Sequence, residues 1–197
     1  MRLRLIAHDA TDGTRRAVFG DATGLAAPEP VAVSRRRAVV CGPERACRET
    51  AGLLTAAGEP GPWEAEVVDD LRAPDMGDWA GRTAEDVLGQ DPFALQAWLQ
   101  DPAFRPPAGE SFEEHLARIG RVLDGRSWPE AGAIVVLSPL SLRAACVHAL
   151  GADAHAALHL DVAPGTTASM SRNAGTWRLS ALVPPRPALA AWNPAGR

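Results

Sequence analysis

The sequence predicts an α/β fold of three layers, α/β/α, around a mostly parallel central sheet. Short apolar runs alternate with helical patterns along the chain, an order that favours parallel strands covered by helices on both faces. The run from Ala133 to Leu137 is too short for a helix and suits a central strand buried on both faces. With 197 residues, 46% of them hydrophobic and 22% charged, the chain fits one compact domain. We expect residues 1–183 to form this domain and the Pro- and Ala-rich residues 184–197 to form an irregular tail.

The first third of the chain predicts strands and one helix, separated by a long polar loop. The segment RLRLIA alternates apolar residues and ends at a His8-Asp9 turn, as expected of a first strand. A second apolar run, residues 38–40, is closed by a Gly-Pro turn. Residues 44–57 then predict a helix with Gly58 as its C-terminal cap. A further short strand is expected over residues 65–68.

Capping signals predict four helices in the rest of the chain. Each start has a Ser, Thr or Asp cap, supported by an acidic residue three positions later or by a proline at the first helical position. The predicted helices begin after Thr83, after Asp91, after Ser111 (running to about Leu123) and at Pro139 (running to Leu150, before Gly151). Residues 167–171 and 176–182 flank a short turn and predict an antiparallel hairpin.

Composition argues against several classes of function. The net charge of −4, with no run of basic residues, indicates neither nucleic acid nor an anionic membrane as a partner. The N-terminal apolar stretch is too short for a signal peptide and no later stretch reaches about 18 residues, so we expect a cytoplasmic protein. Three cysteines without a CxxC pair predict free thiols and no metal site. No glycine-rich cofactor motif is present, so we expect no cofactor and a small-molecule ligand as partner. A homodimer is compatible with the sequence.

Three predicted strands end at residues able to build a site. The carboxyl ends of parallel strands meet at one edge of a sheet, where ligands bind in folds of this class. We therefore expect His8, the Cys41-Gly42 turn and Leu137-Ser138 to lie together at this edge.

Four segments, in order, carry the motifs of a known family. They are IAHDAT (6–11), CGPERACRETA (41–51), DMGDWAG with GESFEE (75–81 and 109–114), and IVVLSPLSLRAA (134–145). Together they resemble the histidine phosphatase superfamily, whose fold is phosphoglycerate mutase-like. The resemblance implies a first histidine that attacks a phosphoryl group, two arginines and a second histidine that neutralise the phosphate oxygens, and a carboxylate that protonates the leaving group.

The sequence departs from this pattern at most of these positions. His8, at the position of the nucleophile, and Thr11 are kept. The two arginine positions fall on Ala7 and Ala46, the acid position on Ala73 and the second histidine position on Ser138. Hydrogen bonds to charged groups contribute about 1.5 to 3 kcal/mol each, so these losses remove more than about 5 kcal/mol of transition-state stabilisation, or about four decades of rate. The lost acid costs about 100-fold more. We therefore predict that the protein is not an efficient phosphatase.

Three interpretations of function remain open. In the first, the protein is a repurposed small-molecule enzyme in which His8 performs acid-base or addition chemistry, with a place in specialised metabolite biosynthesis. In the second, it is a catalytically inactive pseudophosphatase that acts as a binding protein. In the third, it is a weak phosphomonoesterase with a rearranged site, in which one of four other arginines replaces the lost charges: Arg15, Arg16, Arg45 or Arg48.

The candidate catalytic residues are His8 and Asp9. Asp9 either orients the imidazole, as carboxylates do in catalytic pairs, or caps the turn. The candidate substrate-binding residues are Thr11, Arg15, Arg16, Ala46, Ala73, Met76, Trp79, His115, Ser138 and Leu140.

Several of these residues have a structural alternative. Ser138 is a good helix N-cap. Met76 and Trp79 either line a more apolar, roomier pocket or pack a loop. His115 either reaches the edge of the site or lies on a solvated helix face.

Overall fold

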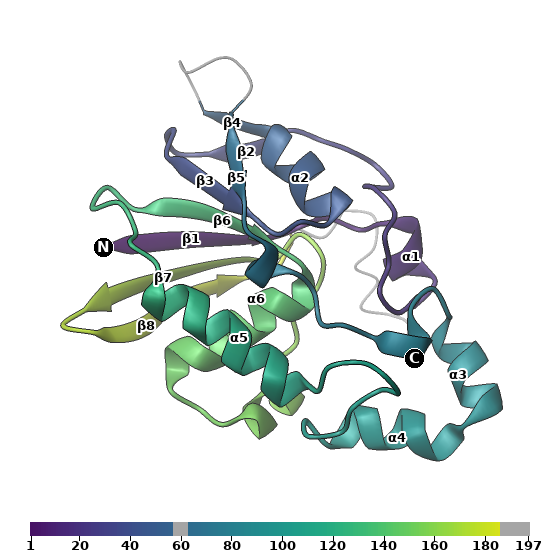
Figure 1. Ribbon diagram of the computed structural model, residues 1–197. Coiled ribbons are helices and arrows are strands. Elements are labelled where there is room, and N and C mark those ends of the chain that lie inside the picture. Colours follow the sequence, from purple (N-terminus) through teal and green to yellow (C-terminus); the bar gives the residue numbers. More distant parts are fainter. Residues whose placement is uncertain (57–62, 186–197) are drawn as a thin grey trace, which may run out of the picture.

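The computed structural model describes residues 1–56 and 63–185, and a six-stranded sheet forms its centre (Figure 1). The strand order is β5-β3-β6-β1-β7-β8. Four of the strands run parallel, and the last two form an antiparallel hairpin at one edge. The strands are β1 (Arg2–Ala7), β3 (Ala38–Cys41), β5 (Ala65–Val67), β6 (Ala133–Leu137), β7 (Thr167–Asn173) and β8 (Thr176–Val183).

Alternating side chains on the strands build two cores, one on each face of the sheet. Successive strand residues point to opposite faces, so Leu5 packs against α5 (Phe112–Gly125) and α6 (Pro139–Leu150). Its neighbour Ile6 packs with α2 (Arg45–Gly52) on the other face. Every residue of β6 is buried. The predicted three-layer architecture and its central buried strand are thus confirmed.

The helix starts follow the predicted caps. Thr83 and Ser111 form capping boxes at the starts of α3 (Ala84–Gln90) and α5. Asp91 accepts a hydrogen bond from the Ala94 N–H at the start of α4 (Pro92–Gln100), and α6 ends at Gly151 in the left-handed conformation. Three short 3-10 helices, η1 (Asp69–Leu71), η2 (Gly77–Trp79) and η3 (Ala154–His159), complete the connections.

Two regions differ from the sequence prediction. The helix expected over residues 44–57 ends at Gly52, because Leu54 is buried in the core beside α2 as part of β4 (Leu54–Ala56), which pairs in parallel with β2 (Val31–Val33). Gly58, the expected cap, lies outside the described residues. The long polar loop contains β2 and the single turn α1 (Asp12–Arg15). Most of the predicted tail, residues 186–197, also lies outside the described part.

The connections α1, α3 and α4 gather beyond the carboxyl ends of the parallel strands (Figure 1). An aromatic cluster holds them together: Phe19 lies 5.2 Å from Trp79 and 5.1 Å from Trp98, centroid to centroid. All three cysteines are buried and free. Within the described ranges, no helix is both long and apolar enough to cross a bilayer.

Leu5 tests the packing of the central sheet. Replacement of this fully buried side chain by Ala is expected to lower the free energy of unfolding by about 2 to 5 kcal/mol, because it leaves a cavity between β1 and the helices of one face. Urea denaturation measures the change. Leu88→Ala on α3 is the control, since Leu88 is 51% exposed and its loss is expected to change stability by about 0.5 kcal/mol or less. Equal effects of the two substitutions would contradict the assignment of the core.

Candidate functional site

The carboxyl ends of three parallel strands meet at one edge of the sheet. The His8 N–H donates to the Leu137 carbonyl at 2.9 Å, and the Gly42 N–H donates to the Val136 carbonyl at 3.0 Å. His8, Gly42 and Ser138 therefore lie together, as the order of strands predicts. A cavity of about 160 Å³ opens beside them. It is lined by His8, Thr14, Val18, Gly20, Asp21, Glu44, Ala73, Pro74, Met76, Ser138, Pro139 and Leu140.

The His8 imidazole is held in one tautomer. The side chain is 6% exposed, and its Nδ1 lies 2.8 Å from the backbone carbonyl oxygen of Asp9. A carbonyl can only accept a hydrogen bond, so Nδ1 is the donor, and in the neutral form of the ring the lone pair lies on Nε2. Nε2 has no hydrogen-bond partner in the described part of the chain, and His8 lines the cavity. This atom is therefore available as a base or a nucleophile.

Two carboxylates that the sequence analysis missed also line the cavity. Asp21 accepts hydrogen bonds from the hydroxyls of Thr11 and Thr23 and from the Thr23 N–H. Burial raises the pKa of Asp21, but these hydrogen bonds and the nearby His8 outweigh it and hold the pKa below its usual value. Glu44, the residue before α2, accepts a hydrogen bond from the Ala73 N–H. The Glu44 carboxylate therefore lies beside the position where the family pattern has its acid.

The loop that carries Ala73 is fixed by one buried guanidinium. Arg118 is 4% exposed, and its NH1 donates to the carbonyls of Asp70 and Arg72 at 2.8 and 3.0 Å. Its NH2 donates to the Ala73 carbonyl at 3.3 Å and to the Glu110 carboxylate at 2.6 Å, and its Nε donates to the same carboxylate at 3.0 Å. From α6, the Ser141 hydroxyl donates to the same Arg72 carbonyl at 3.2 Å.

Five of the predicted site residues line the cavity and the others do not. Those that line it are His8, Ala73, Met76, Ser138 and Leu140; those that do not are Asp9, Thr11, Arg15, Arg16, Ala46, Trp79 and His115. The four arginines considered as replacements are all exposed, and Arg45 pairs with Glu49 at 2.7 Å. None of these four, and no other arginine, is among the residues that line the cavity.

Asp9 and Thr11 act on the backbone next to His8. The Asp9 carboxylate accepts from the Ala10 N–H at 2.7 Å, so it caps the turn, and the carbonyl of Asp9 rather than its carboxylate contacts the imidazole. The orienting role considered for the Asp9 side chain is not what the geometry supports. Thr11 caps α1, and its hydroxyl donates to the Asp21 carboxylate. It therefore positions a residue that lines the cavity without lining the cavity itself.

Ser138, Met76 and Trp79 separate into lining and packing roles. The Ser138 hydroxyl caps α6 by accepting from the Ser141 N–H at 3.1 Å, and the residue also lines the cavity. Met76 lines the cavity. Trp79 is 4% exposed and packs with Phe104 and Phe19 under the loop, which is the structural alternative considered for it.

His115 is neither on a solvated face nor in the cavity. It is fully buried on α5, where its Nδ1 lies 2.9 Å from Arg118 NH2 and 3.8 Å from the Glu110 carboxylate. The solvated-face alternative is wrong, because His115 lies four and eight residues before Ile119 and Leu123, on the apolar side of the helix. Burial, with a smaller contribution from Arg118, lowers the pKa of His115 to about 3.

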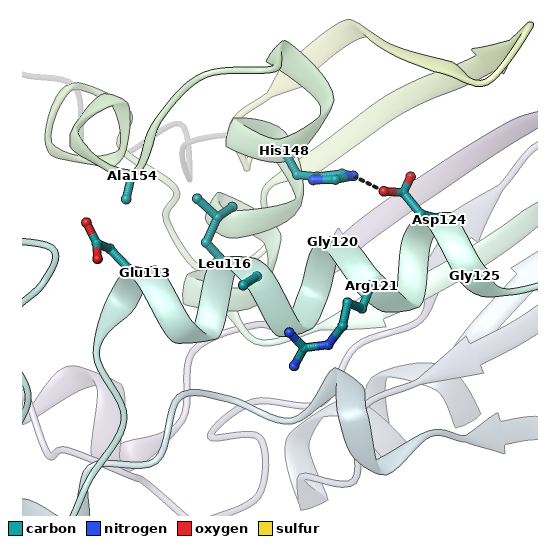
Figure 2. Close-up of a pocket in the computed structure, with 9 residues that line it drawn as sticks. Glu113, Leu116, Gly120, Arg121, Asp124, Gly125, His148 and Ala154 are labelled. Carbon is teal, nitrogen blue, oxygen red and sulfur yellow. Dashed lines mark ion pairs between the residues drawn. The ribbon is translucent and has the colours of Figure 1, made fainter.

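A second, wider hollow of about 670 Å³ runs along α5, away from the strand ends (Figure 2). In Figure 2, His148 from α6 and Asp124 from α5 point toward each other and form an ion pair of 3.2 Å. Gly120 permits this approach of the helices, since a Cβ there would lie 2.7 Å from His148 Nδ1. The polar groups that meet in this hollow are an ion pair between helices, so His148 has a structural role.

Among residues 1–56 and 63–185, no cluster of three or more His, Cys, Asp or Glu side chains is arranged to hold a metal ion. The groups available for chemistry at the cavity are the His8 imidazole, through Nε2, and the carboxylates of Asp21 and Glu44.

The family is established by the sequence match. The profile described as "Histidine phosphatase superfamily (branch 1)" matches residues 22–183, most of the chain, beginning after His8. The chain belongs to the histidine phosphatase superfamily. A bifunctional protein of Mycobacterium tuberculosis is 35% identical over 101 residues, which are 49% of this chain and 28% of that protein. The chain thus spans little more than a quarter of the length of the curated relatives it matches.

Solved structures share the fold at low identity. An alpha-ribazole phosphatase from Shigella flexneri has a TM-score of 0.72 at 18% identity, covering 93% of this chain and 96% of that one. A mycobacterial glucosyl-3-phosphoglycerate phosphatase has a TM-score of 0.72 at 21% identity, covering 90% and 96%. A phosphoglycerate mutase from Thermus thermophilus has a TM-score of 0.66 at 23% identity, covering 93% and 98%. These neighbours establish the phosphoglycerate mutase-like fold.

The buried His115 makes stability depend on pH. Its pKa is about 3 in the folded chain and about 6.5 when unfolded, so below pH 6.5 the unfolded chain binds a proton that the folded chain does not. Stability is therefore expected to fall as the pH drops, by about 2 kcal/mol between pH 6.5 and 5 from this residue. Urea titrations of the native chain and of His115→Gln measure it: the variant should have the flatter pH dependence. Parallel profiles of the two proteins would show that His115 is not held neutral.

Proposed function

We propose that the chain is a small-molecule enzyme of the histidine phosphatase superfamily that has lost phosphate recognition. In this proposal His8 performs acid-base or addition chemistry on a small, non-phosphorylated metabolite, within specialised metabolite biosynthesis. The observation that carries the proposal is the charge of the cavity. Glu44 and Asp21 line it with His8, and no arginine is among its lining residues.

A phosphate monoester has no cationic partner in such a cavity. Two unit charges 4 Å apart interact by about 4 kcal/mol at an effective dielectric of about 20, so a phosphate dianion next to these carboxylates meets repulsion of this order. The start of α6 offers partial positive charge from its amides, but a helix terminus contributes only about 0.3 to 2 kcal/mol. Attraction of this size does not offset the repulsion.

The state of His8 supports a chemical role. Nδ1 is engaged by the Asp9 carbonyl, which leaves Nε2 free toward the cavity. Acid-base catalysis requires a group that can transfer a proton within reach of the ligand, and the His8 imidazole lines the cavity. The same cavity would also serve a pseudophosphatase that binds a ligand without changing it, so the role of His8 is the point that separates the two functions.

Turnover of phosphomonoesters tests the loss of phosphatase activity. Against a panel of monoesters, kcat/KM is expected to lie about four decades or more below that of an active superfamily member assayed in parallel, because the cationic groups that stabilise the transition state are missing. The glucosyl-3-phosphoglycerate phosphatase that shares the fold is a suitable reference. Turnover within tenfold of this reference, abolished by His8→Ala, would restore phosphomonoester hydrolysis as the function.

Replacement of His8 separates enzyme from binding protein. In a strain lacking the gene, complementation by His8→Ala is expected to fail, as scored by the metabolite profile, while the purified variant keeps the native circular dichroism spectrum. His159→Ala, at an exposed histidine of η3, is the matched control and should complement. Full complementation by His8→Ala would reject the enzyme and favour the pseudophosphatase.

A further inference from the structure

Two carboxylates line the same cavity as His8, and one of them, Glu44, is bonded to a backbone N–H and closely packed. One oxygen of Glu44 accepts the Ala73 N–H, and the other lies near Gly42 and Cys47. A Cβ on Gly42 would lie 2.5 Å from that second oxygen, so a larger residue there would displace the carboxylate. The position of Glu44 is therefore built by the fold rather than reached by a free surface side chain.

The second oxygen of Glu44 has no conventional hydrogen-bond donor. It is buried and makes no hydrogen bond with the described residues, although the Cys47 thiol, a weak donor, lies nearby. Buried carboxylates are normally paired with a cation or fully hydrogen-bonded. Because this oxygen is buried beside Gly42 and Cys47, a ligand does not reach it, and what Glu44 contributes to the cavity lining is its negative charge.

The arginines around the cavity are engaged elsewhere. Arg45 pairs with Glu49 at 2.7 Å, and Arg72 lies 3.6 Å from Asp70 on the surface. The buried guanidinium of Arg118 is used on three backbone carbonyls and Glu110. None of these groups is among the residues that line the cavity, so no arginine of its lining offsets the charge of Glu44 and Asp21. Arg143, which lines the adjoining cavity, pairs with Asp161 at 3.4 Å.

His8 supplies the second observation that points to a ligand. Its side chain is 94% buried, being only 6% exposed, and its Nε2 is unpartnered within the described residues. A free imidazole nitrogen in the same cavity as two carboxylates accepts hydrogen bonds and attracts positive charge. All three groups therefore favour a donor-rich cation over an anion.

We propose that the cavity binds the protonated amine of a small ligand, with Glu44 and Asp21 as its counter-charges and His8 Nε2 beside it. This inference rests on the proposed function, since both take the His8 cavity as the working site. An adjoining cavity of about 90 Å³ shares Pro74, Met76 and Leu140 with it. Most of its lining is apolar, including Trp98, Phe104 and Phe112, and its charged lining residues are Asp101, Glu110 and Arg143. The ligand therefore carries an apolar part next to its amine.

Three probes that differ only in the charged group test the inference. Isothermal titration calorimetry at physiological salt compares benzylamine, benzyl alcohol and benzyl phosphate on the full chain. Benzylamine is expected to bind about tenfold or more tightly than benzyl alcohol, because charge-assisted hydrogen bonds are stronger than neutral ones, and benzyl phosphate is expected not to bind. The NMR signals of the His8 imidazole should shift on addition of benzylamine, while those of the exposed His159 should not.

Charge-removing variants locate the counter-charges. Glu44→Gln and Asp21→Asn should each weaken benzylamine about tenfold and leave benzyl alcohol unchanged, with folding of each variant checked by circular dichroism. Glu85→Gln, at an exposed carboxylate of α3, makes the same change in net charge and should leave every affinity unchanged.

The outcomes separate the two proposals. Three results would overturn the amine site: equal binding of benzylamine and benzyl alcohol, no binding of benzylamine at millimolar concentrations, or a loss of benzylamine affinity in Glu85→Gln equal to that in Glu44→Gln. If benzyl phosphate still does not bind in these cases, the proposed function stands. Tightest binding of benzyl phosphate overturns both. Amine binding that depends on Glu44, together with full complementation by His8→Ala, supports the amine site and overturns the enzyme.

Discussion

A single buried guanidinium determines the shape of the site. Arg118 reaches from α5 to the backbone carbonyls of Asp70, Arg72 and Ala73, and it is neutralised by Glu110. Because these carbonyls are fixed, the N–H of Ala73 is presented to the Glu44 carboxylate across the cavity wall. A buried arginine with five engaged donors is costly to disturb. The position of the Glu44 carboxylate at the cavity therefore depends on the contacts of Arg118, a residue of α5 that does not itself line the cavity.

The superfamily fold places strand ends, a histidine and helix starts at one edge, and this chain keeps that frame. His8 follows β1, Gly42 follows β3, and Ser138 opens α6. What differs is the charge around the frame. The proposed loss of cationic groups leaves Ala7, Ala46 and Ser138 at the aligned positions, and the Glu44 carboxylate bonds to the N–H of Ala73, at the position of the lost acid. The proposed change in function is thus one of electrostatics on an unchanged scaffold.

The sequence predicts the fold well, because its signals are local. Caps at Thr83, Asp91 and Ser111 and the apolar run of β6 each act over a few residues, and all are confirmed. The helix after β3 is overestimated because tertiary pairing of β4 with β2 outweighs local helical preference.

The site is predicted only in part. His8, Ala73, Met76, Ser138 and Leu140 line the cavity, and their roles in catalysis and binding stay predictions. Glu44 was missed because its contact with Ala73 spans 29 residues and no local pattern encodes it; the glycine two residues before it is the only nearby signal. The burial of His115, by contrast, was readable from its spacing to Ile119 and Leu123.

The central claim is that the groups around His8 do not hold an oxyanion. A crystal structure of the full chain soaked with orthovanadate, which mimics a phosphoryl group in transfer, measures this directly. We expect no density for vanadate within bonding distance of His8 Nε2, with Glu44 still bonded to the Ala73 N–H. Vanadate attached to His8 Nε2 and held by inward-turned arginines would contradict it.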